Sequence, residues 1–209
     1  MNLVLPKGRL FEGVVVLLRQ SGIKITRPSD RCYHPSCSDP MIDVWIRKPR
    51  AIPQLLSLGL FDVGFCGLDL IKEAGDAQLV PLLNLGLNPV VIVVAVHTSQ
   101  RDLLSTPPKR PILIATEYER LADEWAMKQN LAHITIQTFG STEGYPPVHA
   151  DLVMDCVETG ETMEANGLII LETLFESSTW LVANKKALKD PVVSPRIQHL
   201  QHTLQGVYR

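Results

Sequence analysis

Residues Asp151-Leu-Val-Met-Asp-Cys-Val-Glu-Thr-Gly-Glu-Thr-Met163 give the clearest indication of the fold. The apolar start, residues 152–154, predicts a short strand, and a turn containing Gly160 follows at residues 158–162. Residues 163–166 predict the start of a helix. A strand that leads through a short turn into a helix is the repeating unit of α/β proteins, so this stretch indicates that class.

The same turn offers donors for a phosphate. A helix N-terminus presents backbone N–H groups and the positive end of the helix dipole, and Thr159 and Thr162 add hydroxyl donors. Asp155 and Glu158 come just before the turn, where carboxylates can accept from sugar hydroxyls or hold Mg²⁺ through water. The alternative interpretation is structural, with Thr159 capping an ordinary helix and Gly160 easing a tight turn.

Length and composition limit the class of protein. A chain of 209 residues fits one large domain or two small ones, and 45% apolar with 20% charged residues is typical of a soluble globular protein. A net charge of −2 gives no support to nucleic-acid or membrane binding driven by overall charge. No basic leader with an apolar segment opens the chain, and the longest apolar run, Val90 to Val96, is too short to span a bilayer.

The cysteines indicate a reducing compartment. Cys32 and Cys37, with His34 between them, match no common zinc spacing and are interpreted as incidental, so no metal ligand is assigned. Cys66 and Cys156 lie in apolar, strand-like runs and are expected to be reduced and buried. We therefore expect a cytoplasmic protein.

Strands and helices alternate along most of the chain, which predicts a parallel α/β architecture. Strands are expected at residues 2–5, 41–47, 61–65, 79–83, 90–96, 111–115, 133–138, 152–154, 168–174 and 179–183. Helices are expected at residues 10–20, 52–58, 70–74, 119–129, 163–166 and 195–207. Residues 27–41 show no period and predict a loop or an irregular hairpin, and residues 85–89 predict a turn.

Two groups of these units predict two lobes. The first lobe is expected to comprise residues 1–90 and 179–209, and the second residues 91–178. Lys7, Arg9 and Arg50 follow predicted strands of the first lobe, at the carboxyl ends where open α/β sheets bind ligands. The alternative is that they are solvated cations on loops.

Two motifs resemble the ATP phosphoribosyltransferase family, which catalyses the first step of histidine biosynthesis. They are Leu5-Pro-Lys-Gly-Arg-Leu10 and the more specific Asp155-Cys-Val-Glu-Thr-Gly-Glu-Thr-Met-Glu-Ala-Asn-Gly167. Shorter matches follow in family order at residues 49–53, 62–69, 140–143 and 181–184. The resemblance implies a two-lobe fold similar to type II periplasmic binding proteins, with the active site in the cleft between the lobes.

The resemblance also implies the chemistry. N1 of the adenine of ATP attacks C1 of phosphoribosyl pyrophosphate and pyrophosphate leaves, with Mg²⁺ as cofactor. No protein nucleophile is needed, because positioning and charge stabilisation carry the catalysis. The catalytic residues implied are Lys7, Arg9, Arg50 and Asp155, with the three cations facing polyphosphate. The substrate-binding residues implied are Glu143, Asp155, Glu158, Thr159, Gly160, Glu161 and Thr162, with the turn at 158–162 holding the ribose 5-phosphate.

In length the chain resembles the short form of the family. That form implies a homodimer within a hetero-oligomer that contains a regulatory subunit resembling histidyl-tRNA synthetase, with no nucleic acid or membrane partner. Four positions depart from the family pattern: Val91, Glu117 and Trp180 stand where cations are usual or frequent, and Ala51 where Asp is usual. These departures leave open a second reading, a non-catalytic paralogue that binds a phosphosugar or nucleotide as a regulatory subunit.

Overall fold

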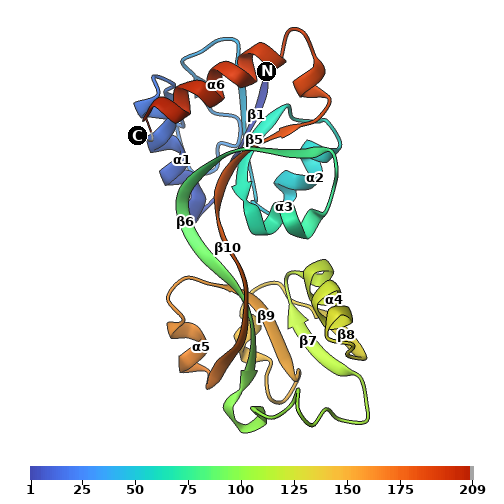
Figure 1. Cartoon of the computed structure of the whole chain (residues 1–209). Helices are drawn as coiled ribbons and strands as arrows, with labels where there is room; N and C mark the ends of the chain where they lie inside the picture. Colours follow the sequence, from blue (N-terminus) through green and yellow to red (C-terminus); the bar gives the residue numbers. More distant parts are fainter. Residues whose placement is uncertain (208–209) are drawn as a thin grey trace. The chain divides into compact units, whose positions relative to one another are not determined.

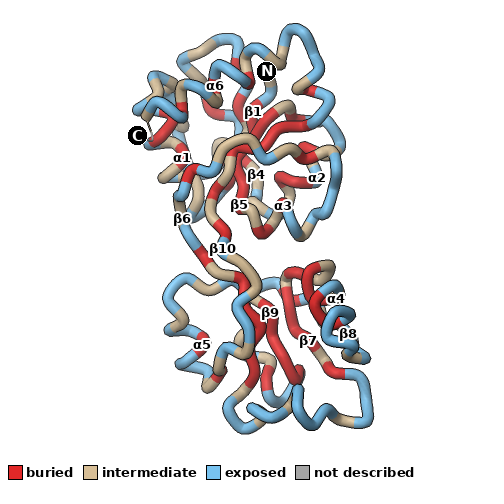
Figure 2. The backbone as a smooth tube through the Cα atoms, viewed as in Figure 1, coloured by how far each residue is buried: buried red, intermediate tan, exposed pale blue. Residues whose placement is uncertain are grey.

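The computed structural model describes residues 1–207 and divides the chain into two compact units. Unit 1 comprises Met1–Asn88 together with the described residues from Ser178 onward, and unit 2 comprises Pro89–Ser177. The sequence placed these boundaries after residues 90 and 178. Each unit has its own buried strands, which Figure 2 shows in red.

In unit 1, three parallel strands carry the core. Strand β1 (Asn2–Pro6) lies between β4 (Asp43–Arg47) and β5 (Val63–Gly67), and β5 pairs antiparallel with the end of β10 (Leu168–Asn184). The helices, labelled in Figure 1, are α1 (Arg9–Gln20), α2 (Ala51–Ser57), α3 (Leu68–Ala74) and α6 (Ser194–Val207). A short 3₁₀ turn, η3 (Ala187–Lys189), precedes α6. The predicted irregular hairpin is the pair β2 (Ile25–Thr26) and β3 (Ser36–Cys37).

Alternation along β1 explains how these helices divide between the two faces. Leu3 and Leu5 belong to the cluster that includes the buried residues of α1 and α6, whereas Val4 belongs to the cluster with α2 and α3. Successive strand residues point to opposite faces, so a short apolar strand buries both sides. The predicted terminal helix is confirmed, because Ile197, Leu200 and Leu204 are all buried.

Unit 2 repeats this arrangement on a smaller scale. Strand β7 (Ile112–Thr116) lies between β8 (His133–Gln137) and β9 (Leu152–Val157), all three parallel, and β9 pairs antiparallel with β6 (Leu79–His97). The helical segments are η1 (Thr98–Gln100), α4 (Glu119–Lys128), η2 (Thr142–Gly144) and α5 (Glu161–Ala165). The parallel register places the carboxyl ends of β7, β8 and β9 at one edge.

The turn predicted at residues 85–89 was wrong, because β6 continues through it. Gly86 and Asn88 take the left-handed backbone conformation, with φ of 58° and 51°. The Gly86 N–H donates to Asn84 Oδ1 at 2.8 Å, and the Ser178 hydroxyl donates to the same oxygen at 2.7 Å. Turn-forming residues therefore bend the strand without ending it. Likewise, the two strands predicted at 168–174 and 179–183 form one strand, β10.

One further expectation, on the cysteines, needs correction. Cys156 is exposed although it was expected to be buried, because the apolar part of β9 ends at Met154 and the strand continues to Val157. Cys66 is buried as expected, and burial strongly raises the pKa of its thiol. None of the helices within residues 1–207 combines the length and apolar character needed to cross a bilayer.

Candidate active site

The carboxyl edge of unit 2 gathers polar side chains from three strands. Glu117 follows β7, Thr138 follows β8, and Asp155 lies near the end of β9. In sheets with parallel strands this edge is where ligands bind.

A pocket of about 210 Å³ opens at the turn from β9 to α5. It is lined by Glu143, Asp155, Cys156, Val157, Glu158, Thr159, Gly160, Thr162 and Met163. The structure thus brings together every substrate-binding residue predicted from the sequence except Glu161, which does not line the pocket. Glu143 comes from η2, so two chain segments form the wall.

Backbone geometry gives the turn its shape. Gly160 caps α5 with φ of 86°, a conformation that a residue with a side chain rarely adopts. The Glu161 N–H donates to Thr159 Oγ1 at the long distance of 3.4 Å, so Thr159 also serves the local turn weakly. The first N–H groups of a helix have no intrahelical acceptor, and they add donors at this point.

Asp155 is the most perturbed carboxyl group of the pocket. Burial raises its pKa to about 6, and the negative charges of Glu117 and Glu143 act in the same direction. Hydrogen bonds from the Cys156 N–H, at 2.7 Å, and from Thr142 oppose this rise. A partly buried carboxylate near other carboxylates is stabilised by any ligand that brings donors or positive charge.

Three threonines that the sequence reasoning missed hold the loops around Asp155. Thr116 Oγ1 donates to the Met154 carbonyl at 2.8 Å and accepts from the Tyr118 N–H at 2.7 Å. Thr138 and Thr142 share a hydrogen bond at 2.8 Å, and both are buried. The sequence offered one indication of this role, namely that Thr116 ends a strand and Thr138 directly follows one.

In unit 1 the predicted cation Lys7 follows β1. Its N–H donates to the Arg47 carbonyl at 2.7 Å, which ties it to the end of the neighbouring strand β4. Its ammonium donates to the Tyr33 hydroxyl at 2.8 Å, and this bond and charge lower the pKa of Tyr33. Lys7 is thus an exposed cation held by an aromatic partner.

The other two predicted cations occupy different places in unit 1. Arg9 is exposed and begins α1, whereas Arg50 is exposed and precedes α2. Arg50 lines a cavity of about 390 Å³ with residues of α2 and α3 that include Ser57 and Glu73. Lys7 and Arg9 do not line that cavity, and Asp155 belongs to unit 2, so the four residues predicted as catalytic do not form one cluster within either unit.

An aromatic cluster beside Lys7 was also missed. The rings of His34 and Trp45 stack with centroids 4.1 Å apart. Asp43 accepts from His34 Nε2 at 2.6 Å and from Trp45 Nε1 at 2.9 Å, and these bonds lower its pKa, the His34 bond most. The cluster fastens the segment predicted as a loop onto β4, and alternation along that strand was its only signal.

The departures from the family pattern have structural counterparts. Val91 is opposite Val157 in the β6–β9 pair and packs in the apolar cluster of unit 2. Trp180 is opposite Cys66 and packs in an apolar cluster of unit 1, and among residues 1–207 its buried indole N–H has no hydrogen-bond partner. Apolar packing therefore replaces the cations at these two positions.

Comparison with known proteins decides the family. The sequence model described as HisG, ATP phosphoribosyltransferase, matches residues 48–206. The chain belongs to the ATP phosphoribosyltransferase family. A relative of that name from Pelotomaculum thermopropionicum is 33% identical over 100% of this chain and 73% of its own length. Another, from Solibacter usitatus, is 32% identical over 99% of this chain and 72% of its own.

Solved structures agree with the family and with the fold. A chain of the ATP phosphoribosyl transferase (HisG:HisZ) complex from Thermotoga maritima superposes with a TM-score of 0.86 and 26% identity, covering 100% of this chain and 98% of that one. The alkanesulfonate-binding protein SsuA from Xanthomonas axonopodis pv. citri gives a TM-score of 0.51 at 12% identity, covering 99% and 72%. The second likeness concerns the fold alone, and it confirms the α/β architecture of two lobes similar to periplasmic binding proteins.

Proposed function

We propose that this protein is an ATP phosphoribosyltransferase that moves the phosphoribosyl group of phosphoribosyl pyrophosphate to N1 of ATP and releases pyrophosphate. The observation that carries this proposal is the pocket at the turn from β9 to α5. It combines carboxylates with hydroxyl and backbone donors on one short segment. That combination suits a phosphorylated sugar, which presents hydroxyls at one side and a phosphate at the other.

Each part of the pocket has a role in this reaction. Asp155 and Glu158 accept hydrogen bonds from the ribose hydroxyls, and Glu143 adds a third carboxylate to the same wall. Thr159, Thr162 and the backbone around Gly160 hold the 5-phosphate. With the sugar held at both ends, C1 is presented to the attacking nitrogen, and catalysis follows from position because the adenine is itself the nucleophile.

The cations of unit 1 take the polyphosphate groups. Lys7, Arg9 and Arg50 are all exposed, and each follows or begins an element at the carboxyl edge of parallel strands. Phosphate oxygens accept strongly from ammonium and guanidinium groups. These residues would stabilise the negative charge that develops on the departing pyrophosphate.

Mg²⁺ fits the donor set as a cofactor that arrives with the substrates. Glu143, Asp155 and Glu158 offer carboxylate oxygens, the ligands that Mg²⁺ prefers. Within residues 1–207 no three His, Cys, Asp or Glu side chains form a metal-binding group by themselves, so phosphate oxygens would complete the coordination. The ion would neutralise the repulsion between a polyanion and this acidic wall.

We also propose that the chain forms a homodimer and works with a regulatory subunit resembling histidyl-tRNA synthetase. The structural relative from Thermotoga maritima is a HisG:HisZ complex and matches this chain over nearly its whole length. That similarity supports a hetero-oligomer here.

The test is an assay of the purified chain with ATP, phosphoribosyl pyrophosphate and Mg²⁺, with and without the candidate regulatory subunit. We expect pyrophosphate and phosphoribosyl-ATP to appear in equal amounts, and chelation of Mg²⁺ to stop both. Binding of phosphoribosyl pyrophosphate by calorimetry without product, in the presence of the subunit, would contradict the transferase and favour the non-catalytic paralogue.

A further inference from the structure

A second cavity, of about 300 Å³, lies in unit 1 away from Lys7 and the strand ends that carry it. Its walls come from α6, from Ser21 and Ile23 after α1, and from Met41 and Ile42 before β4. Residues that precede the parallel strands lie at their amino edge, whereas Lys7 follows β1 at the carboxyl edge. The cavity is therefore separate from the residues of unit 1 that we assign to phosphoribosyl transfer.

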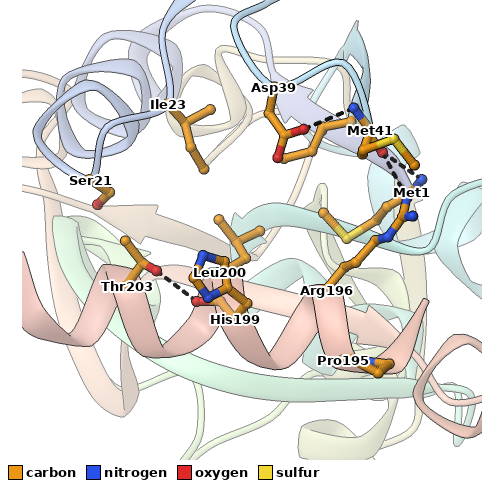
Figure 3. Close-up of a pocket in the computed structure, with 11 residues that line it drawn as sticks. Met1, Ser21, Ile23, Asp39, Met41, Pro195, Arg196, His199, Leu200 and Thr203 are labelled. Atoms are coloured by element: carbon orange, nitrogen blue, oxygen red, sulfur yellow. Dashed lines mark hydrogen bonds between the residues drawn. The ribbon is translucent and has the colours of Figure 1, made fainter. Parts of the chain in front are cut away.

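Its interior is largely apolar. Ile42 and Leu200 are buried, and Figure 3 shows Ile23 facing Leu200 across the space. Small-molecule sites occupy about 300–1,000 Å³, so this cavity is at the lower limit and suits a compact body, about one ring or one branched chain.

Arg196 provides a positive charge in the wall. It belongs to the first turn of α6 and is partly buried. Within residues 1–207 its guanidinium makes one hydrogen bond, to the Met41 carbonyl at 3.4 Å, which is long for this type of bond. A guanidinium has five donors in a planar fork and remains charged, so most of its capacity here is available to a bidentate acceptor such as a carboxylate.

Asp39 adds the opposite charge. It lines the same cavity, and one of its oxygens accepts from the Met41 N–H at 2.8 Å. Figure 3 places Asp39 and Arg196 on the side of Met41, whereas Leu200 and Ile23 form the apolar part. A ligand that carries an ammonium next to its carboxylate would meet Asp39 as well as Arg196.

We propose that this cavity binds a compact molecule with a carboxylate on an apolar body, held by Arg196 at the carboxylate and by Ile23 and Leu200 at the body. The ligand class follows from an apolar pocket with few placed polar groups, among which the Arg196 guanidinium forms no ion pair within residues 1–207. The binding does not depend on the proposed transferase activity, so failure of one leaves the other standing.

The experiment titrates 3-phenylpropanoate, its uncharged amide and L-phenylalanine into the whole chain, with binding followed by calorimetry and by amide chemical shifts. The carboxylates should bind and shift signals around Ile23 and Leu200, and the amide should not. Arg196→Ala should weaken binding about 10- to 100-fold, because a charge-assisted bidentate pair is lost. The matched control is Arg19→Ala, an exposed arginine on α1 outside the cavity, which should leave binding unchanged.

Asp39→Asn distinguishes the two sources of the carboxylate. If this variant loses affinity for L-phenylalanine and not for 3-phenylpropanoate, the cavity is assigned to amino acids. If the substitution affects the affinities for both probes equally, the cavity is assigned to simple carboxylic acids. Thermal unfolding of each variant verifies that it folds. The proposal is overturned if the amide binds as tightly as the acids, if Arg196→Ala binds them normally, or if no probe shifts the cavity signals. It is also overturned if Arg196→Ala impairs only binding of the regulatory subunit, which would make the cavity a protein contact.

Discussion

Asp151, which immediately precedes strand β9, and Asp155, near the carboxyl end of that strand, show how different surroundings shift a carboxyl pKa in opposite directions. Asp151 is buried, and its carboxylate accepts from Arg110 at 2.6 and 2.8 Å and from the Leu113 N–H at 2.8 Å. Arg110 holds its pKa below the ordinary value. Asp155, near the carboxyl end, has its pKa raised to about 6 by burial, and the charges of Glu117 and Glu143 add to the rise.

This difference distinguishes a carboxylate that stabilises the fold from one that is available to a ligand. The Asp151 carboxylate is satisfied by the protein, so its charge stabilises the fold. The hydrogen bonds to the Asp155 carboxylate do not offset its burial and the nearby carboxylates, so its charge costs stability that a ligand can recover. A carboxylate whose surroundings disfavour its charge is typical of a binding site. The following predictions test this contrast between Asp151 and Asp155.

Asp155→Asn should produce the largest effect on activity. It removes a charged acceptor for the ribose hydroxyls, and one such hydrogen bond contributes about 1.5–3 kcal/mol, so kcat/KM for phosphoribosyl pyrophosphate should fall about 10- to 150-fold. Asp151→Asn should leave the activity of folded protein near normal and instead lower the free energy of unfolding by about 1–3 kcal/mol. Steady-state kinetics and urea unfolding measure the two effects.

Glu164→Gln is the matched control for that pair, because Glu164 is exposed on α5 and does not line the pocket. Glu164→Gln should change neither kcat/KM nor the free energy of unfolding appreciably. If Asp155→Asn and Asp151→Asn altered activity and stability in the same proportions, the contrast between the two aspartates would be invalid.

The two aspartates should change the pH dependence of the free energy of unfolding in opposite directions. The pKa of Asp155 rises on folding from 3.8 to about 6, so the folded state binds the extra proton and the free energy of unfolding falls as pH rises between these values. Above pH 6 the cost is at most about 3 kcal/mol, because each pKa unit between 3.8 and about 6 corresponds to about 1.4 kcal/mol. The stabilisation from Asp151 is present above its unfolded pKa and is lost as pH falls through its lowered folded pKa.

Urea unfolding between pH 4 and 8 checks this sign. Asp155→Asn should be more stable than the natural chain at pH 8, with the difference disappearing toward pH 4. A constant difference across the range would mean that Asp155 does not titrate as its surroundings indicate.

Most of the fold was predictable because apolar periodicity determines which elements form. The strand and helix of residues 152–166 and the terminal helix were found in this way. Periodicity did not reveal that Gly86 and Asn88 would stay within β6, because residues that readily adopt a positive φ are typical of turns. Most of the pocket residues were also predictable from sequence, since they are local to one turn, whereas Glu143 comes from η2 and was indicated by the family resemblance alone. Thr116 and Thr138 were not predictable, because their role depends on which strands are neighbours.

Thr162→Ala should have a moderate and selective effect. Its exposed hydroxyl is proposed to donate to the 5-phosphate, so its loss should weaken binding of phosphoribosyl pyrophosphate about 3- to 10-fold and change ATP binding little. Thr173→Ala, an exposed threonine on β10 outside the pocket, is the control. Calorimetry with each ligand measures both, and equal losses for the two ligands would contradict the assignment of this turn to the sugar phosphate.

Glu117→Lys should give the smallest effect, and it returns the cation usual at this position. Glu117 contributes to the raised pKa of Asp155, so a positive charge there should lower that pKa and favour polyanions at the same edge. We expect phosphoribosyl pyrophosphate to bind about 2- to 5-fold more tightly at low salt, with the gain reduced at high salt by screening. Glu164→Lys, with the same change of charge outside the pocket, separates a local effect from a general one. If both variants tightened binding equally, net charge would be responsible, and if neither did, the neighbouring groups of this chain would already supply what the family's cation provides.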